Sequence, residues 1–67
     1  MKVKVREVVP AHRYEDEMGL ARVEYSRAGW RVSCMVNDLD YTLPHHRVGP
    51  ENVGFVVRAA LSGVRVV

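Results

Sequence analysis

Cysteine is nearly absent from this chain of 67 residues, and that scarcity closes one route to stability. The one cysteine, Cys34, cannot form a disulfide within the chain, which fits a reducing compartment. A domain of this size buries only about 60% of the surface that its unfolded chain exposes, so small domains commonly rely on disulfides, metals or oligomerisation. Self-association and a bound metal are therefore the two remaining sources of extra stability.

Long apolar runs are missing as well. No stretch approaches the roughly 20 apolar residues of a membrane-spanning helix. Residues 1–6 alternate charged side chains with valine, which is not the pattern of a secretory signal peptide. We therefore expect a cytoplasmic protein that makes no contact with membranes.

Recognised catalytic motifs are also lacking. The chain has no P-loop, no dinucleotide-binding glycine pattern, no nucleophile elbow and no helix-turn-helix pair. The sequence favours a non-catalytic protein over an enzyme, and it predicts no cofactor. Its 48% hydrophobic and 27% charged residues are an ordinary globular balance, so we predict one folded domain over residues 1–67.

The clearest structural signal is a strict alternation of apolar and polar side chains within residues 20–43, which predicts half-buried strands. Two-residue turns at Ala28-Gly29 and Asn37-Asp38 would fold this segment into a three-stranded antiparallel meander. The predicted buried face then has three rows, Tyr25–Val32–Leu43, Val23–Cys34–Tyr41 and Ala21–Val36–Leu39. A slip of one residue would turn this face to solvent, so the pattern specifies which side is buried.

The flanking segments complete an α+β fold. Residues 2–9 alternate and predict an N-terminal strand that extends the meander, whereas residues 10–19 predict a polar loop. Farther on, the apolar spacing lengthens to that of one helix face, so we predict a helix over residues 50–62, packed on one face of the sheet. Residues 64–67 form either a short last strand or a tail that pairs with another chain.

The solvent-facing side of the predicted sheet is a candidate nucleic-acid surface. It carries five cations, Lys2, Lys4, Arg6, Arg22 and Arg31. Two acids, Glu24 and Asp40, share this face, so it is more basic than the chain as a whole, whose net charge is +2. Because no aromatic residue lies there, it would contact phosphates without stacking bases. The alternative is a solvated face with cross-strand salt bridges.

Three loop histidines, His12, His45 and His46, are candidate metal ligands. Together with the acidic residues 15–17 they would make a mixed nitrogen and oxygen site, although their spacing matches no zinc or metalloprotease pattern. The alternatives are solvated histidines and solvated acids. Cys34 lies on the predicted buried face, where a thiol behaves as a small, unreactive apolar side chain.

These observations lead to three functional hypotheses. The first is a small interaction or regulatory module that acts through protein–protein contacts as a homodimer, since an open sheet leaves an edge strand free for pairing. Its predicted interface is Val64, Val66 and Val67. The alternatives are a nucleic-acid-binding module that uses the basic sheet face, and a metal or enzymatic site at the loop histidines.

Overall fold

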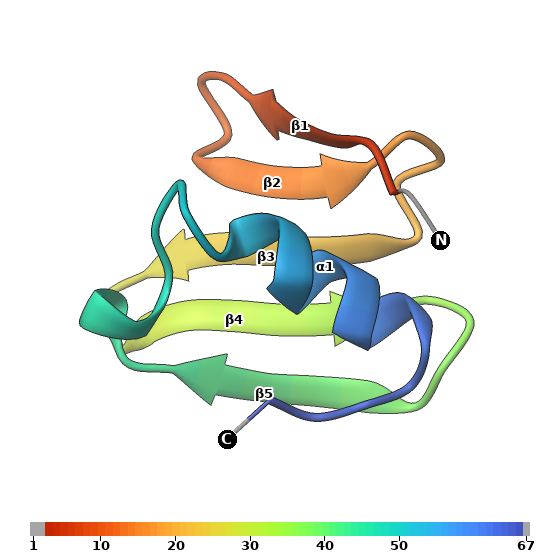
Figure 1. Cartoon of the computed structure of the whole chain (residues 1–67). Helices are drawn as coiled ribbons and strands as arrows, with labels where there is room; N and C mark the ends of the chain where they lie inside the picture. Colours follow the sequence, from red (N-terminus) through yellow and green to blue (C-terminus); the bar gives the residue numbers. More distant parts are fainter. Residues whose placement is uncertain (1–2, 67) are drawn as a thin grey trace.

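The computed structural model describes residues 3–66 and has an α+β architecture, with one antiparallel sheet and one α-helix (Figure 1). The elements in chain order are β1 (Val5–Val8), β2 (Arg13–Asp16), β3 (Ala21–Ser26), β4 (Gly29–Cys34), β5 (Leu39–Leu43), a 3-10 turn η1 (His45–Arg47) and α1 (Val53–Leu61). The five strands lie side by side in chain order, each antiparallel to the next. The sheet is therefore a five-stranded meander, larger than the predicted one.

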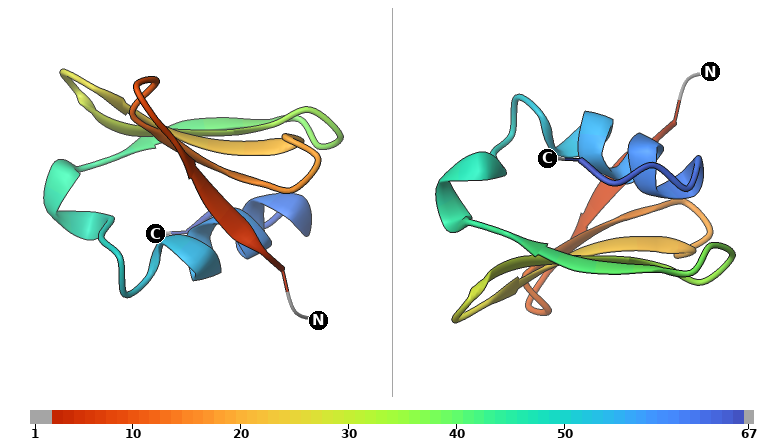
Figure 2. Two further views of the ribbon diagram at one scale, coloured as in Figure 1. Left: turned by 90° about the horizontal axis from the view of Figure 1, so that it is seen from above. Right: turned by 90° about the horizontal axis from the view of Figure 1, so that it is seen from below.

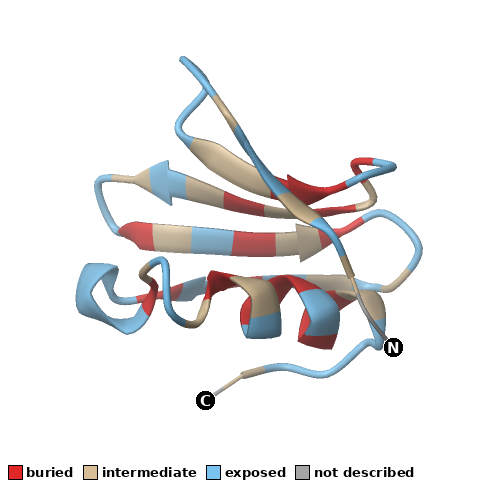
Figure 3. Cartoon of the chain, turned by 45° about the horizontal axis from the view of Figure 1, so that its top comes forward, coloured by how far each residue is buried: buried red, intermediate tan, exposed pale blue. Residues whose placement is uncertain are grey.

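Helix α1 covers one face of the sheet, here called the inner face (Figure 2). The outer face is the opposite side. The core lies between α1 and the middle strands, and Figure 3 shows the buried residues concentrated there. Four valines, Val23, Val32, Val56 and Val57, are buried to 1% exposure or less. Fully burying a valine side chain contributes about 1.5–3 kcal/mol, so these contacts hold a helix of modest intrinsic propensity on the sheet.

Residues 10–19 contain strand β2 where the sequence predicts a polar loop. In its register with β3, Tyr14 lies opposite Val23 and Glu15 lies opposite Arg22. Tyr14 therefore packs against the core, and Glu15 lies on the outer face among arginines. This strand is mostly polar because its outer face forms charge pairs. It therefore lacks the alternation of apolar and polar residues by which the other strands are predicted.

The buried aspartate of this region builds the turn between β2 and β3. Asp16 is only 6% exposed, and its two carboxylate oxygens accept hydrogen bonds from the amides of Met18 at 3.2 Å and Ala21 at 2.8 Å. The amide of Gly19 donates to the carbonyl of Asp16 at 3.0 Å. The prediction that residues 15–17 are solvated is thus wrong for Glu15 and Asp16, although Glu17 is exposed.

Both predicted hairpins have a register that is wrong by two residues. The β3–β4 turn is formed by residues 27–28, and Val23 lies opposite Val32 where Cys34 was predicted. The β4–β5 loop spans four residues, 35–38, and Val32 lies opposite Tyr41. A shift of two keeps every side chain on the same face. The predicted burial of Val32 and Cys34 is therefore confirmed, at 0% and 8% exposure.

The flanking elements are shorter than predicted. The N-terminal strand predicted over residues 2–9 is β1, Val5–Val8, and the helix predicted over residues 50–62 is α1, Val53–Leu61. The helix begins late because residues 49–53 first form a turn, in which the carbonyl of Gly49 accepts the amides of Asn52 and Val53. None of the helices in the described range 3–66 is long and apolar enough to cross a membrane.

The segment after α1 is not a strand in its described part, residues 64–66. It runs back beside α1, on the inner side of the sheet (Figure 2). The amide of Val66 donates to the Tyr41 hydroxyl at 2.9 Å, and the Arg65 guanidinium lies 4.9 Å from the centre of the Tyr41 ring. The described part of this tail is therefore held by the Tyr41 side chain and not by pairing as a strand of the sheet.

Candidate functional site

Four apolar side chains that are more than half exposed come from three segments at one end of the molecule. They are Met18 (79% exposed), Met35 (71%), Val36 (61%) and Val64 (55%). They belong to the β2–β3 turn, the β4–β5 loop and the chain after α1, which Figures 1 and 2 show at the same end. We call this surface the apolar end.

Hydrogen bonds between the three segments hold the apolar end in place. The amide of Met35 donates to the carbonyl of Leu20 at 2.7 Å, which joins the two turns. The side-chain amide of Asn37 donates to the carbonyls of Ala60 at 3.1 Å and Leu61 at 3.0 Å. The last carbonyls of a helix lack partners within the helix, so Asn37 both caps α1 and anchors the β4–β5 loop to it.

The opposite end of the molecule carries a row of four rings, Tyr14, Trp30, Tyr25 and His45, here called the ring row. Tyr14 and Trp30 have centroids 5.9 Å apart, and Tyr25 meets Trp30 in a T-shaped contact at 5.2 Å. His45 stacks on Tyr25 at 4.7 Å with an interplanar angle of 25°. Its Nε2 lies 2.6 Å from the carbonyl oxygen of Ser26, which fixes the ring. Tyr25 is 55% exposed, so this end of the predicted buried face is open to solvent.

The basic outer face of the sheet is organised around a buried carboxylate. Glu15 is 4% exposed and accepts hydrogen bonds from Arg6 at 2.6 Å and from Arg13 at 3.3 Å. The Nε atom of Arg22 lies 3.9 Å from the same carboxylate. The hydrogen bond from Arg6 holds the pKa of Glu15 below its ordinary value although burial opposes this, and the positive charge of Arg13 acts in the same direction. Three guanidinium groups thus surround one carboxylate.

The other cations predicted to bind nucleic acid are differently placed. Arg31 forms two hydrogen bonds with Asp40, at 2.9 and 2.6 Å, which lower the pKa of Asp40 and raise that of Arg31. Lys4 is exposed beside the start of β1, and Lys2 lies outside the described residues. The outer face therefore carries the cross-strand salt bridges of the alternative interpretation, with the greatest excess of positive charge around Glu15.

The three candidate metal ligands do not form a cluster. Within residues 3–66, no three histidine, cysteine, aspartate or glutamate side chains are placed so that they could hold a metal ion. His45 is instead stacked on Tyr25, and His12 has a φ of +52° in the β1–β2 turn, where its carbonyl accepts the amide of Tyr25 at 3.0 Å. His46 is exposed in η1.

Two other groups singled out in the sequence are engaged within the fold. Cys34 is buried, and its sulfur accepts a hydrogen bond from the Asn37 side-chain amide at 3.6 Å. Of the predicted interface residues, Val64 is exposed at the apolar end and Val66 packs against the core, while Val67 lies outside the described residues.

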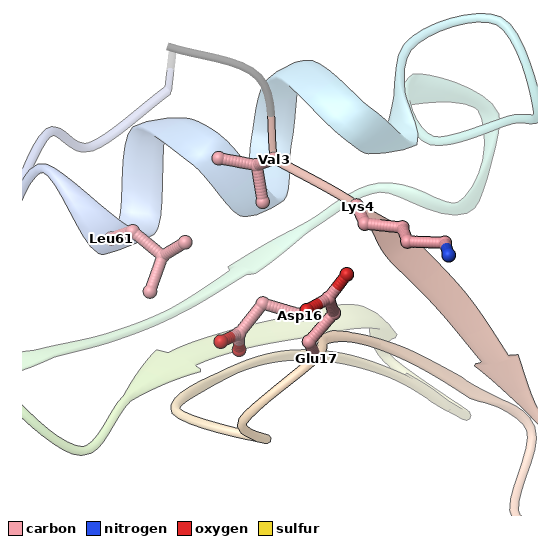
Figure 4. Close-up of a pocket in the computed structure, with 5 residues that line it drawn as sticks. All are labelled: Val3, Lys4, Asp16, Glu17 and Leu61. Atoms are coloured by element: carbon pink, nitrogen blue, oxygen red, sulfur yellow. The ribbon is translucent and has the colours of Figure 1, made fainter.

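A shallow hollow of about 220 Å³ lies between the N-terminal segment and the end of α1 (Figure 4). Its lining is Val3, Lys4, Asp16, Glu17 and Leu61. Both oxygens of Asp16 accept backbone amides, and Figure 4 shows the Lys4 side chain directed away from the two acids. The hollow therefore holds no pair of groups arranged for acid–base chemistry.

The comparisons with known proteins found no matching family model, no matching curated protein and no matching solved structure. The candidate function therefore depends on the surfaces of this chain. Of these two surfaces, the sequence pointed only to Val64, as an interface residue, and to His45, as a metal ligand. A usable signal was present, because Tyr25 and Trp30 flank one turn while Met18 and Met35 lie in two others.

Proposed function

We propose that this chain is a non-catalytic interaction module that contacts a protein partner through its apolar end, and that this partner is a second copy of the chain. The observation that carries the proposal is the exposure of Met18, Met35, Val36 and Val64 at one end of a small domain. Exposed apolar side chains cost solvation free energy, and in soluble proteins groups of them commonly mark contact surfaces.

The character of these side chains supports a protein partner. Methionine is flexible and polarisable, so it adapts to the shape of an apposed surface. The loops beneath are fixed by the Asn37 and Met35 hydrogen bonds, so less order has to be gained on binding.

A second copy is the partner that also relieves the size limit of the chain. A domain of this length buries a smaller share of its surface than a larger domain does, and dimerisation adds apolar burial without a longer sequence. Most such dimers are two-fold and use the same patch on both copies. The apolar end can meet its own copy in this way, and within residues 3–66 no strand pairs with the outer edge of β5.

Light scattering after size-exclusion chromatography tests this proposal with a matched pair of variants. Val36→Glu places a charge in the apolar end, whereas Val9→Glu places the same charge at a valine that is 76% exposed in the β1–β2 turn at the other end. We expect wild type and Val9→Glu to reach twice the chain mass at high concentration and Val36→Glu to remain monomeric. A wild-type protein that stays monomeric, or equal dimerisation of both variants, would overturn the second copy as partner.

A further inference from the structure

The ring row suggests a second, independent binding activity. We propose that the end of the molecule opposite the apolar end binds single-stranded nucleic acid, with a base stacked on the ring row and phosphates attracted by the surrounding basic loops. This site differs from the outer sheet face considered in the sequence, and it does not depend on the proposed self-association.

The geometry of the ring row suits a planar base. Tyr25 and His45 already lie in a near-parallel stack, with centroids 4.7 Å apart, and both residues are exposed. The short contact between His45 and the carbonyl of Ser26 fixes the imidazole plane before any ligand arrives. A base that stacks on this exposed pair extends an existing stack, and such stacking is open to every base because each has a π-face.

The rings behind this pair keep it rigid. Trp30 is half-buried, with Tyr14 and Tyr25 packed against it at 5.9 and 5.2 Å. Both of these neighbours are held by strand pairing, Tyr25 in β3 and Tyr14 in β2. A rigid platform loses little conformational entropy when a ligand binds, so more of the stacking energy appears as affinity.

The two ends of the molecule differ in charge, and the ring-row end is the one that favours an anionic ligand. The loops at the ring-row end, residues 9–12, 27–28 and 44–52, contain two arginines, all three histidines and one acid, Glu51. The segments at the apolar end, residues 17–20, 35–38 and 62–66, contain two acids and one cation, Arg65. Phosphates are therefore drawn toward the exposed rings and away from the apolar end.

A single strand is the form that fits both features. Bases in a duplex are paired and stacked on each other, so they present no free face to a protein ring. An unpaired strand offers a free base and a phosphate on either side of it. Arg27 follows Ser26 directly, in the turn that Tyr25 and Trp30 flank, so a cation lies close in the chain to the stacking rings.

Trp30 provides the assay, because it is the only tryptophan in the chain. Its fluorescence would be recorded during titration with an oligothymidylate of about 12 nucleotides at low salt, and in parallel with heparin, a polyanion without bases. We expect saturable quenching by the oligonucleotide, little quenching by heparin, and weaker binding as salt rises. Equal quenching by both polyanions, or no binding of the oligonucleotide, would overturn the proposal.

Variants test the stacking residues directly. Tyr25→Ala should weaken oligonucleotide binding about tenfold, in the range found when a stacking ring is removed, and Tyr25→Phe should retain it. The matched control is Phe55→Ala, since Phe55 is 56% exposed on α1 and lies outside the ring row. His45→Ala, which changes an exposed residue of η1, should weaken binding like Tyr25→Ala and covers the case that the latter fails to fold. Equal binding by the alanine variants at all three positions would refute a base-stacking site.

Discussion

Replacing Gly29 with alanine should remove much of the stability of this fold. Gly29 opens β4 with a φ of +143°, and a Cβ built on it would lie 2.1 Å from the carbonyl oxygen of Leu43 and 3.1 Å from a methyl carbon of Thr42. The first of these contacts is impossible for real atoms, and the atom in the way is backbone. Strands β4 and β5 would have to separate where Trp30 pairs with Leu43.

Two penalties add up in this variant. Holding a residue other than glycine at so unfavourable a φ costs about 1–3 kcal/mol. Forcing an extra methyl group into packed structure costs about 1–3 kcal/mol more. A domain of this length is stable by about 3–10 kcal/mol in total, from roughly 0.05–0.15 kcal/mol per residue. The combined loss of about 2–6 kcal/mol is of the same size, so we expect Gly29→Ala to be unfolded or to unfold at much lower urea concentration.

The matched control is Gly54→Ala. Gly54 lies within α1, and a Cβ built there has no heavy atom within 4 Å. Alanine at such a helix position should stabilise the fold by about 0.5–1 kcal/mol. Both variants would be unfolded in urea and followed by circular dichroism and by the fluorescence of Trp30. If Gly29→Ala unfolds at the wild-type urea concentration, the close approach of β4 and β5 and the register derived from it are wrong.

Three further predictions concern single side chains. Asn37→Ala should lower the free energy of unfolding by about 1–3 kcal/mol in urea, because the carbonyls of Ala60 and Leu61 lose a donor; wild-type stability would contradict this. The pKa of Glu15 is lowered from 4.5, so its stabilising effect is complete above that pH and is lost as the pH falls through its folded-state pKa. Thermal melts between about pH 6 and pH 2 should show an acid-induced decline that Glu15→Gln reduces, and identical pH profiles would count against the arginine cluster. Cys34, at 8% exposure, should react with Ellman's reagent only after unfolding, and rapid labelling of the native protein would contradict its burial.

The alternation of side chains predicted which face of the sheet is buried, because that property depends only on parity. Val23, Val32 and Tyr41 lie in one buried row, although the predicted partners differ by two residues. Apolar patterns that repeat every two residues fit equally well when a strand slides by two. Register therefore depends on the turns, where sequence signals are shorter and weaker.

The turn residues were misread because each has a role that depends on distant parts of the chain. The sequence predicts Gly29 as a turn residue, but the carbonyl of Leu43 approaches it so closely that no side chain fits. The sequence predicts a turn at Asn37 because asparagine tolerates a positive φ, but the Asn37 side chain caps a helix more than 20 positions along the chain. Neither role is visible before the fold brings the partners together.

The candidate surfaces can be grouped from the sequence only when residues 13–16 are recognised as a strand of the meander. In an antiparallel meander, alternate turns lie at opposite ends of the sheet. Residues 9–12, 27–28 and 44–50 must then share one end, and residues 17–20 and 35–38 must share the other. Sorted in this way, the three histidines and two arginines fall at one end, where Glu51 follows directly, and two methionines and two acids fall at the other.

This separation has a consequence for the two proposed activities. Val36 and Tyr25 lie at opposite ends of the sheet, so a partner bound at one surface does not block the other. A dimer joined at its apolar ends would present two ring rows facing outward, and a long single strand that reached both would bind more tightly than a short one because the second contact is intramolecular. Val36→Glu should then leave the affinity for a short oligonucleotide unchanged and abolish the advantage of a long one. If instead Val36→Glu weakens binding of the short oligonucleotide, the two surfaces are coupled and the assignment of separate roles to the two ends fails.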